Sequence, residues 1–364
     1  MKCKLSDICE YRKGKVNVSN LTLKTYISTE NMLPNKAGVV EANSLPSTTL
    51  VQEYKENDTL VSNIRPYFKK VWQAKHDGGC SNDVLVFQGK ANVDKDFLYY
   101  ILANDDFFAY SMATSKGTKM PRGDKKSIMQ YELQLFDIKV QKKIVSILKL
   151  LDKKIELNNA INNNLAQQAK TIYQAWFEKF ILSNGSCPPT WKRGILADIA
   201  NITSGKRPPK KSTVKQNGFE IPLLGATSIV GFTNEANYTN KILVIGRVGT
   251  HGIVQRINSP CWASDNTLVI TSELYEYTFQ ILQKINYHAM NRGSTQPLIT
   301  QADMNKVDIL IPDNQILTEF ESIVGQLMKK YETNLMENTK LAELRDYLLP
   351  CLLSGELDVS QINI

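Results

Sequence analysis

The chain has 364 residues, of which 42% are hydrophobic and 22% charged, and its formal net charge is +8. These values are typical of two or three ordinary globular domains. No run of 18 apolar residues occurs, and the start, MKCKLSDICEYRKGK, lacks the apolar core of a signal peptide. We therefore expect a cytoplasmic protein with no membrane contact.

The cysteines and the charge distribution narrow the possibilities further. The six Cys residues form no C-x-x-C pair, so the sequence indicates neither a zinc site nor a disulfide framework. Residues 1–140, 141–185 and 186–315 each carry four more basic than acidic residues, whereas 316–364 carry four more acidic ones. The basic character therefore belongs to the chain before residue 316.

Residues 1–140 predict a mixed domain of short strands and helices. DTLVSNI (58–64) and NDVLVFQ (82–88) have the composition of strands, and Gly78–Gly79 marks a turn between them. The stretch 94–112 has helical periodicity. A basic loop punctuated by Gly and Pro follows it, SKGTKMPRGDKKS.

Residues 141–182 predict one long helix, because 141–180 contain neither Pro nor Gly. Core-type residues recur there at alternating steps of four and three, which places them in one seam along the helix. Forty helical residues span about 60 Å at about 1.5 Å per residue, and a rod of that length cannot bury its seam against itself. It needs a partner. The seam consists of Ile144, Leu148, Leu151, Ile155, Asn158, Asn162 and Leu165.

The second half of the chain repeats this order. Residues 183–190, SNGSCPPT, interrupt the helix and predict a linker. Residues 191–315 predict a second globular domain, with strands at ILVIG and NTLVI, a helix at SELYEYTFQILQKIN and a loop at MNRGSTQPL. Residues 316–350 predict a second long helix, and 351–364 form a C-terminal tail.

The second helix carries the seam of the first, displaced by 176 residues without a gap. Even the polar positions recur, Asn158 at Asn334 and Asn162 at Asn338. A buried Asn in a seam costs stability but fixes the register. The alternative that stays open is that all four Asn side chains face solvent. The second seam consists of Phe320, Val324, Leu327, Tyr331, Asn334, Asn338, Leu341 and Leu348.

The globular halves also match each other in sequence. The offset is 191 residues at LSDI (5–8), 183 in the strand-like segments, and 176 at Gly117 and Pro121, where it stays through the helices. The halves therefore share a scaffold while their loops, which carry binding residues, differ. The predicted fold class is α+β, with two similar globular domains and two long helices.

Each globular half contains one tight basic cluster, as expected of a nucleic-acid surface. The alternative is an ordinary solvated face, but two clusters, one in each half, favour nucleic acid. The clusters are Lys116, Lys119, Arg122, Lys125 and Lys126 in the first half, and Lys206, Arg207, Lys210, Lys211 and Lys215 in the second.

Motifs for catalysis are missing from the sequence. His76, His251 and His288 are not at metal-ligand spacing, and no G-x-x-x-x-G-K-[ST] phosphate loop, no G-x-G-x-x-G after a strand and no G-x-S-x-G elbow occurs. The Asn-Pro-Pro-aromatic motif of amino-methyltransferases is absent as well. Glu53-Tyr54-Lys55 resembles half of a nuclease motif, but such tripeptides arise often by chance. We therefore expect a non-catalytic protein without a cofactor or metal.

Several motifs resemble the DNA specificity subunit of type I restriction–modification systems. STQPLI (294–299) leads into ILIP (309–312), and LRDYLLP (344–350) is followed by LLSGEL (352–357). In the first half, NIRPY (63–67) and Ser81-Asn82-Asp83 are similar to that family too. The resemblance covers the whole chain, and the motifs around the helices are its more specific part.

This resemblance implies a function and partners. The globular halves would be target-recognition domains that bind double-stranded DNA, and the helices would pair as an antiparallel coiled coil, giving a pseudo-two-fold internal repeat. The coiled coil would set the spacer and bind two modification subunits, which use S-adenosylmethionine to methylate adenine. Two restriction subunits join them where cleavage is present. Each domain would read one half of a bipartite, asymmetric site.

Residues in the loops are the predicted DNA contacts, on chemistry alone. Arg can read guanine edges with two hydrogen bonds, whereas Lys more often neutralises phosphate. The predicted contacts are Arg65, Lys69, Lys116, Lys119 and Arg122 in the first half, and Arg207, Lys210, Lys211, Arg247, His251 and Arg292 in the second. Two other functions remain open: a coiled-coil scaffold that binds nucleic acid without reading sequence, and a catalytic methyltransferase or nuclease.

Overall fold

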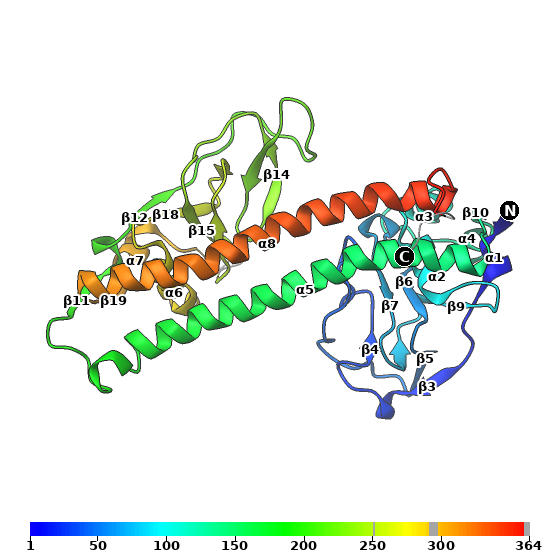
Figure 1. The fold of residues 1–364 in the computed structure, drawn as a ribbon, viewed down its shortest axis with the longest axis horizontal. Coiled ribbons are helices and arrows are strands. Elements are labelled where there is room, and N and C mark those ends of the chain that lie inside the picture. Colours follow the sequence, from blue (N-terminus) through cyan, green and yellow to red (C-terminus); the bar gives the residue numbers. More distant parts are fainter. Residues whose placement is uncertain (250–251, 291–297, 360–364) are drawn as a thin grey trace. The chain divides into compact units, whose positions relative to one another are not determined.

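The computed structural model describes residues 1–249, 252–290 and 298–359. The chain divides into two compact units (Figure 1), of which unit 1 comprises Met1–Asn158 with Met336–Ile364 and unit 2 comprises Asn159–Leu335. Both units contain sheets and helices. Each unit also contains one stretch of each long helix, α5 (Ile138–Phe177) and α8 (Asn314–Ser354).

Unit 1 is built on an antiparallel sheet with the strand order β2-β9-β6-β7. A second sheet has the order β3-β5-β8-β4, and β1 pairs with β10. The strands are β1 (Lys2–Lys4), β2 (Cys9–Tyr11), β3 (Lys15–Asn17), β4 (Tyr26–Ile27), β5 (Leu50–Tyr54), β6 (Thr59–Ser62), β7 (Val71–Gln73), β8 (Gly78–Cys80), β9 (Val84–Gly89) and β10 (Glu132–Gln134). The helices besides α5 and α8 are α1 (Leu5–Ile8), α2 (Lys95–Ala103), α3 (Asp105–Ala113) and α4 (Lys125–Ile128), with 3₁₀ turns η1 (Val18–Asn20) and η2 (Pro66–Phe68).

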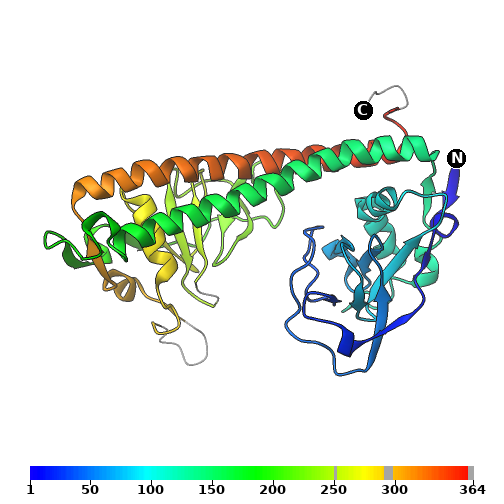
Figure 2. The same cartoon turned by 60° about the horizontal axis from the view of Figure 1, so that its bottom comes forward.

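Strand β9 is apolar on both faces because both faces of its sheet are covered. Leu85 and Phe87 pack with α2 and with the α5 and α8 stretches of this unit, whereas Val84 and Val86 pack with Tyr54 of the second sheet. A strand between two layers has no solvent side, so it reads as a continuous apolar run. Figure 2 shows the elements of this unit from another side.

Unit 2 repeats the arrangement. Its main sheet has the order β12-β18-β15-β16, a second sheet has the order β14-β13-β17, and β11 pairs with β19. The strands are β11 (Lys192–Ile195), β12 (Asn201–Ser204), β13 (Ile221–Leu224), β14 (Ile229–Thr233), β15 (Ile242–Gly246), β16 (Val254–Ile257), β17 (Trp262–Ala263), β18 (Thr267–Thr271) and β19 (Asp308–Ile311). The helices are α6 (Tyr275–Lys284) and α7 (Gln301–Asn305), with 3₁₀ turns η3 (Ile181–Ser183) and η4 (Leu196–Asp198).

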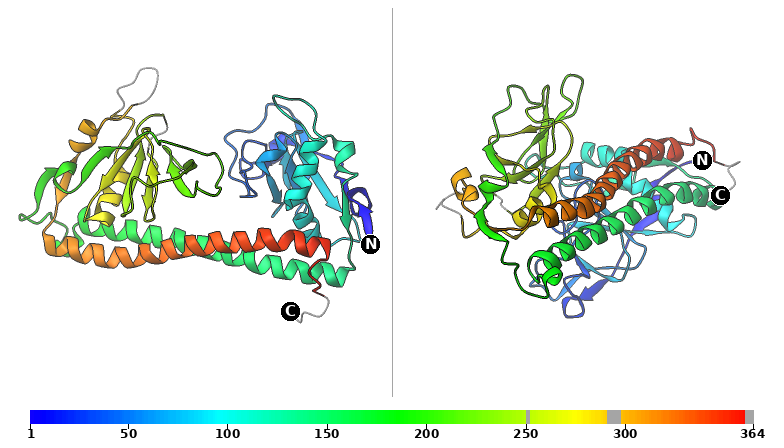
Figure 3. Two further views of the ribbon diagram at one scale, coloured as in Figure 1. Left: turned by 90° about the horizontal axis from the view of Figure 1, so that it is seen from above. Right: turned by 60° about the vertical axis from the view of Figure 1, so that its left-hand side comes forward.

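The two main sheets have matching strand orders, because β2, β9, β6 and β7 correspond to β12, β18, β15 and β16. The second sheets match too, because each contains one parallel pair of strands. In unit 1, β4 pairs with β8, and in unit 2, β13 pairs with β17. Helix α6 packs between its sheet and the α5 and α8 stretches of unit 2 (Figure 3), as α2 does in unit 1. The internal repeat of the sequence is therefore a repeat of the fold.

The single helix that the sequence predicts over 94–112 is two helices, α2 and α3, and the prediction was wrong at this point. Asn104 has extended backbone angles, φ −69° and ψ 142°, and ends α2. Its side-chain oxygen accepts from the Asp106 N–H and so caps α3. Asn competes for backbone hydrogen bonds and prefers caps, which explains the break.

In each unit the stretches of α5 and α8 pack together and run in opposite directions. In unit 1, Arg345 donates to Asp152 at 2.8 Å and Asn158 donates to Asn338 at 2.9 Å, so the partner moves back along α8 as α5 advances. In unit 2, Asn334 donates to Asn162 at 2.9 Å. The ring of Phe177, further along α5, lies 5.0 Å from that of Phe320, earlier along α8.

None of the residues of the two predicted seams is exposed. Asn158, Asn162 and Asn334 are fully buried, so the solvent-facing alternative for these three side chains does not hold. Helix α8 continues through Pro350 to Ser354, beyond the predicted end at residue 350, because Leu349 and Leu352 on its last turns are buried in the core of unit 1. The buried seam residues are Ile144, Leu148, Asn158, Asn162, Phe320, Val324 and Asn334, and the half-buried ones are Leu151, Ile155, Leu165, Leu327, Tyr331, Asn338, Leu341 and Leu348.

Along the described part of the chain, the structure has no helix both long and apolar enough to cross a membrane.

Candidate nucleic-acid interface

The basic loop 206–211 of unit 2 is held at its backbone while its charged side chains stay exposed. The indole N–H of Trp262 donates to the carbonyl of Lys206 at 2.7 Å, and the hydroxyl of Thr233 donates to the carbonyl of Lys210 at 2.7 Å. Trp262 and Thr233 are both buried. Because core residues hold the backbone of this loop, the backbone needs little ordering on binding a ligand.

Gly205 allows this loop to approach the turn that precedes β18. A Cβ at Gly205 would lie 2.1 Å from the carbonyl oxygen of Ser264 and 2.7 Å from that of Ala263. The neighbouring Lys206 N–H donates to the Ala263 carbonyl at 2.9 Å. Only glycine permits backbones to approach this closely.

A hollow of about 800 Å³ lies beside this loop; we call it the second-domain hollow. Arg207, Lys210 and Lys211 line it, and the turn 264–266 also contributes to its wall. Ser264 is only 6% exposed, and its Oγ has no hydrogen-bond partner among the described residues. The remaining lining residues are Pro208, Pro209, Leu223, Gly225, Ala226, Val230 and Val248.

Arg247 directly follows β15 and precedes Val248, which lines the second-domain hollow. Its backbone N–H donates to the carbonyl of Asn266 at 2.8 Å, and its half-buried side chain has an Nε without a partner in the described chain. His251 and Arg292, the other predicted contacts of this domain, lie outside the described residues. Four of the six second-half predictions can therefore be placed, and three of these line one hollow.

In unit 1, the structure brings Arg65, Lys116 and Arg122 together. Isolated β-bridges join Ile64 to Arg122 and Lys116 to Arg122, and the Arg65 N–H donates to the Pro121 carbonyl at 2.8 Å. The sequence separates Arg65 from the other two by more than fifty positions. A shared surface is therefore a product of tertiary structure.

Arg65 and Lys69 flank the turn η2 in left-handed conformations, with φ of 50° and 51°. Such angles are uncommon for residues with a Cβ and cluster at functional sites. The Lys69 N–H donates to the Pro66 carbonyl and closes this turn at 2.8 Å. The strain supports a binding role for the turn.

Three of the five predicted contacts in unit 1 are paired with carboxylates of the same domain. Lys69 contacts Asp105 at 2.7 Å, Lys116 contacts Asp124 at 2.6 Å, and Arg122 contacts Asp83 at 3.2 Å. Arg65 and Lys119 are exposed and have no ion pair with a described residue. The acids of the first domain therefore pair with three of its five predicted contact cations.

The pKa values of two of these carboxyl groups agree with the pairing. The hydrogen bond from Lys116, together with one from the backbone of Ser127, holds the pKa of Asp124 well below its ordinary value. For Asp105, burial raises the pKa, but the hydrogen bonds from Lys69 and Lys36 outweigh burial and lower it. Both acids are therefore ionised at neutral pH and oppose the charge of their lysines.

Sequence reasoning missed two candidates, Lys13 and Lys15. They flank Gly14, which matches Gly205 at the offset of 191 residues, so Lys15 corresponds to Lys206. Both lysines are exposed. Extending the LSDI match by seven residues along the sequence would have found them.

Side chains that could ligate a metal are dispersed in the part of the chain that the structure describes. It contains no cluster of three or more His, Cys, Asp or Glu side chains placed to hold a metal ion. In the nuclease-like tripeptide, Lys55 pairs with Glu53 at 2.8 Å and with Asp77 at 3.2 Å, so both acids are engaged with the same ammonium group. The tripeptide is accounted for by surface ion pairs at the end of β5.

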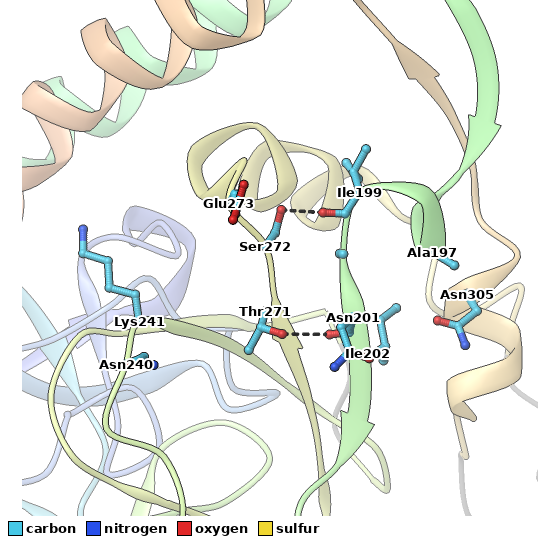
Figure 4. A pocket seen from close by; sticks show the side chains of 11 residues that line it. Ala197, Ile199, Asn201, Ile202, Asn240, Lys241, Thr271, Ser272, Glu273 and Asn305 are labelled. Atoms are coloured by element: carbon cyan, nitrogen blue, oxygen red, sulfur yellow. Dashed lines mark hydrogen bonds between the residues drawn. The ribbon is translucent and has the colours of Figure 1, made fainter. Parts of the chain in front are cut away.

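A further hollow of about 640 Å³ lies in unit 2 beside β12 (Figure 4). The hydroxyls of Thr271 and Ser272 donate to the carbonyls of Asn201 and Ile199, at 3.4 and 2.7 Å. The charged residues among its described lining are Lys241 and Glu273. This lining combines backbone-bonded hydroxyls and single charges, which is a structural arrangement and not a set of catalytic partners.

A duplicated α+β fold with two long helices and a different basic surface in each repeat defines the class of this protein. The chain belongs to the family described as "Type I restriction modification DNA specificity domain", which matches residues 1–167 and 188–345. The resemblance found in the sequence is thereby confirmed, as is a mixed α and β fold with two repeated domains.

Two named relatives and one solved structure agree with this assignment. The chain is similar to the type I restriction enzyme HindI specificity subunit of Haemophilus influenzae, at 24% identity over 97% of this chain and 100% of the relative. It is similar to the type I restriction enzyme MjaIX specificity subunit of Methanocaldococcus jannaschii, at 25% identity over 75% of this chain and 71% of the relative. The crystal structure of a type I restriction–modification S subunit from M. genitalium shares the fold, with a TM-score of 0.58, 17% identity and coverage of 99% and 96%.

Proposed function

We propose that this chain is the DNA-specificity subunit of a type I restriction–modification complex. Each globular domain reads one half of a bipartite, asymmetric DNA site, and α5 and α8 form an antiparallel coiled coil that sets the spacer. The observation that carries the proposal is the repeated sheet order with unlike loops in the two units. One scaffold used twice with different loops gives two different half-sites.

The helices explain how two readers can act on one duplex. Antiparallel helices relate the two repeats by an approximate two-fold axis, which matches the symmetry of the DNA backbone. A helix of about 60 Å is long enough to separate two readers by one turn of DNA, about 34–36 Å, or more. The bases between the half-sites are then skipped.

The arginines and lysines of the loops are suited to two different kinds of DNA contact. Arg65, Arg122, Arg207 and Arg247 are suited to guanine edges because a guanidinium can donate two parallel hydrogen bonds. The lysines of both domains are suited to phosphates, which position the protein without reading sequence. His251 and Arg292 belong to the same proposal as further second-domain contacts.

The helices are also the proposed docking site for two modification subunits. Leu150 and Leu157 lie seven residues apart on α5 and are more than half exposed, and Tyr347 on α8 is 70% exposed. Exposed large apolar side chains at helical spacing support a protein partner. The partners supply S-adenosylmethionine and methylate adenine, whereas this chain contributes no catalytic group. Restriction subunits add cleavage where they are present.

A domain exchange tests the modular reading of DNA. Residues 191–310 are replaced by the second domain of another family member, and the assembled complex is used to methylate DNA. Methylated adenines are then located by sequencing, in the source genome for the parent and in a host for the chimera. We expect one half-site to change while the other half-site and the spacer stay.

Two outcomes would contradict the proposal. If both half-sites change, the domains do not read independently. If methylation occurs without any sequence preference, the scaffold alternative holds. Tight binding of S-adenosylmethionine by the purified chain alone, measured by calorimetry, would instead support the catalytic alternative.

A further inference from the structure

The two domains differ in whether their basic residues form ion pairs with carboxylates of the same domain. In the first domain, Lys69, Lys116 and Arg122 each contact a carboxylate within 3.2 Å. In the second domain, no member of the basic cluster forms an ion pair with any described residue. This cluster consists of Lys206, Arg207, Lys210, Lys211 and Lys215. An acid held next to a lysine cancels much of its attraction for phosphate, so the two surfaces are electrostatically unequal.

Matched positions show where the difference arises. Asp83 of the first domain corresponds to Asn266 of the second at the offset of 183 residues, and Arg122 corresponds to Leu298 at the offset of 176. The same isolated bridge joins Ile64 to Arg122 in one domain and Val248 to Leu298 in the other. The scaffold is thus retained while an ion pair is replaced by an amide and an apolar residue.

The second-domain hollow also contains a group that needs a partner. Ser264 is buried, lines the hollow, and has an Oγ without a hydrogen-bond partner among the described residues. An unpaired buried hydroxyl is costly unless a ligand or a water satisfies it. Arg207, Lys210 and Lys211 line the same hollow, against one acid, Asp265. Lys210, Lys211 and the hydroxyl of Ser264 fit a DNA backbone phosphate, and Arg207 at the same hollow stays available for a base edge.

We propose that the second-domain hollow is a backbone-phosphate site, and that the second domain supplies most of the salt-dependent DNA affinity of this chain. In the first domain, three of the five predicted contact cations are already paired with carboxylates of the same domain, so this domain releases fewer counterions and contributes the smaller part of the salt dependence. This inference rests on the proposed function, because it assigns unequal roles to its two DNA-reading domains.

Salt dependence measures this difference directly. Each phosphate contact contributes about −0.9 to the slope of log affinity against log salt on duplex DNA. Removing two contacts therefore reduces the slope by about 1.8, which changes the affinity ratio between 50 and 200 mM salt by about tenfold. Removing a cation that is already paired changes the slope little.

The experiment uses the full chain assembled with its modification subunits and duplexes with and without the methylated site. Lys210→Gln/Lys211→Gln is compared with Lys69→Gln/Lys116→Gln, which removes the same charge from the first domain. Lys192→Gln/Lys306→Gln, at exposed lysines outside the hollow lining, serves as the control. We expect the slope to fall by about 1.8 in the first variant and by less than half of that in the other two. Equal falls for the two domains would overturn the inference.

Two further variants test the causes separately. Asp83→Asn/Asp124→Asn releases Arg122 and Lys116, while Asn at 124 can still cap α4 as Asp124 does. The salt slope should become steeper, and an unchanged slope would count against neutralisation by these acids. Ser264→Ala should weaken binding about fivefold on every sequence without changing the slope, since it removes a neutral donor. Unchanged affinity would exclude Ser264 from the phosphate site.

The outcomes separate this inference from the proposed function. The ratio of affinities for the methylated site and for unrelated DNA tests sequence reading. The distribution of the salt slope between the domains tests the electrostatic division. Specific binding with equal slopes overturns the division alone, whereas the absence of DNA binding overturns both.

Discussion

The side-chain amide of Asn334 on α8 donates to the side-chain oxygen of Asn162 on α5 at 2.9 Å, and both side chains are buried. Asn162 in turn donates to the carbonyl of Tyr331 at 3.2 Å. Within unit 2, a shift of either helix would separate these groups and place an amide against apolar residues. The pair therefore selects one register for the two helix stretches.

We predict that replacing one partner of this pair lowers the stability more than replacing both. Asn334→Leu leaves the Asn162 oxygen without its donor and should lower the free energy of unfolding by about 1–3 kcal/mol. Asn162→Leu/Asn334→Leu replaces both amides by apolar groups and should recover most of that loss. Urea unfolding of the single and double variants measures the cycle. The exposed Asn163→Leu is the control and should change stability by less than about 0.5 kcal/mol; a single variant as stable as the parent would refute the prediction.

A second prediction extends to the spacer. Changing Asn158, Asn162, Asn334 and Asn338 all to Leu should raise the thermal stability and loosen the register, because Leu pairs tolerate sliding that amides do not. The readout is adenine methylation by the assembled complex on sites with altered spacers. A variant that keeps its spacer as strictly as the parent and gains no stability would show that the amides do not set it.

Arg256 joins the second domain to α8. From β16 it donates to Glu276 of α6 at 2.5 and 2.8 Å and to Glu332 of α8 at 3.1 Å. Its side chain is almost fully buried. Arg256→Met would leave Glu276 buried and unpaired, and we expect a loss of about 3–5 kcal/mol in the free energy of unfolding.

Chemical denaturation of the full chain measures this loss. The control is Lys24→Met, which removes a cation from the exposed pair of Lys24 and Glu41 and should cost less than about 1 kcal/mol. Similar losses for both variants would mean that burial does not increase the contribution of the Arg256 ion pairs to the free energy of unfolding.

Glu321 predicts a pH dependence. Its carboxylate accepts the N–H groups of Glu276 and Tyr277 in the first turn of α6, at 3.0 and 2.8 Å. Burial raises the pKa of Glu321 above its ordinary value of 4.5, and the two N–H groups offset this only in part. The folded chain therefore binds this proton more tightly than the unfolded chain. Stability from this group is fully present below pH 4.5 and is lost as the pH rises through the raised pKa.

Glu321→Gln removes that titration. We expect the stability of the parent relative to this variant to decline as the pH rises above 4.5, measured by urea unfolding at each pH. Glu319→Gln makes the same charge change at an exposed position of α8 and is the matched control. Parallel curves of stability against pH for the parent and Glu321→Gln would show that burial does not raise the pKa of Glu321.

Two glycines should respond to alanine in opposite ways. Gly205→Ala places a Cβ 2.1 Å from the Ser264 carbonyl oxygen, so the loop 206–211 must move. We expect a loss of about 1–3 kcal/mol and weaker binding of the second half-site. Gly325 lies inside α8, and a Cβ added there would have no neighbouring atom within 4 Å, so Gly325→Ala should stabilise the chain by up to about 1 kcal/mol. Thermal unfolding of both variants decides this, and a neutral Gly205→Ala would remove the argument for close approach.

Much of the fold could be predicted from periodicity and repetition. The seam spacing marked both long helices, and the drifting offset indicated a shared scaffold in the two halves, which the matching sheet orders confirm. The helix break at Asn104 was missed, because an Asn within an apolar-periodic run does not reveal whether its side chain will cap a new helix. The two basic clusters could be found from the sequence, but Lys13 and Lys15 were missed, because the run Arg12-Lys13-Gly14-Lys15 is shorter than either cluster.

The sequence by itself determined the repeat, the two helices and the position of the basic loops, because these depend on local spacing and composition. Only the tertiary structure decided which cations are neutralised. Arg122 meets Asp83 across 39 residues of sequence, and Lys69 meets Asp105 across 36. Charge pairing depends on distances of a few ångströms between side chains. Such distances arise only once the strands have paired, so two basic clusters of equal size in sequence become unequal surfaces in the folded protein.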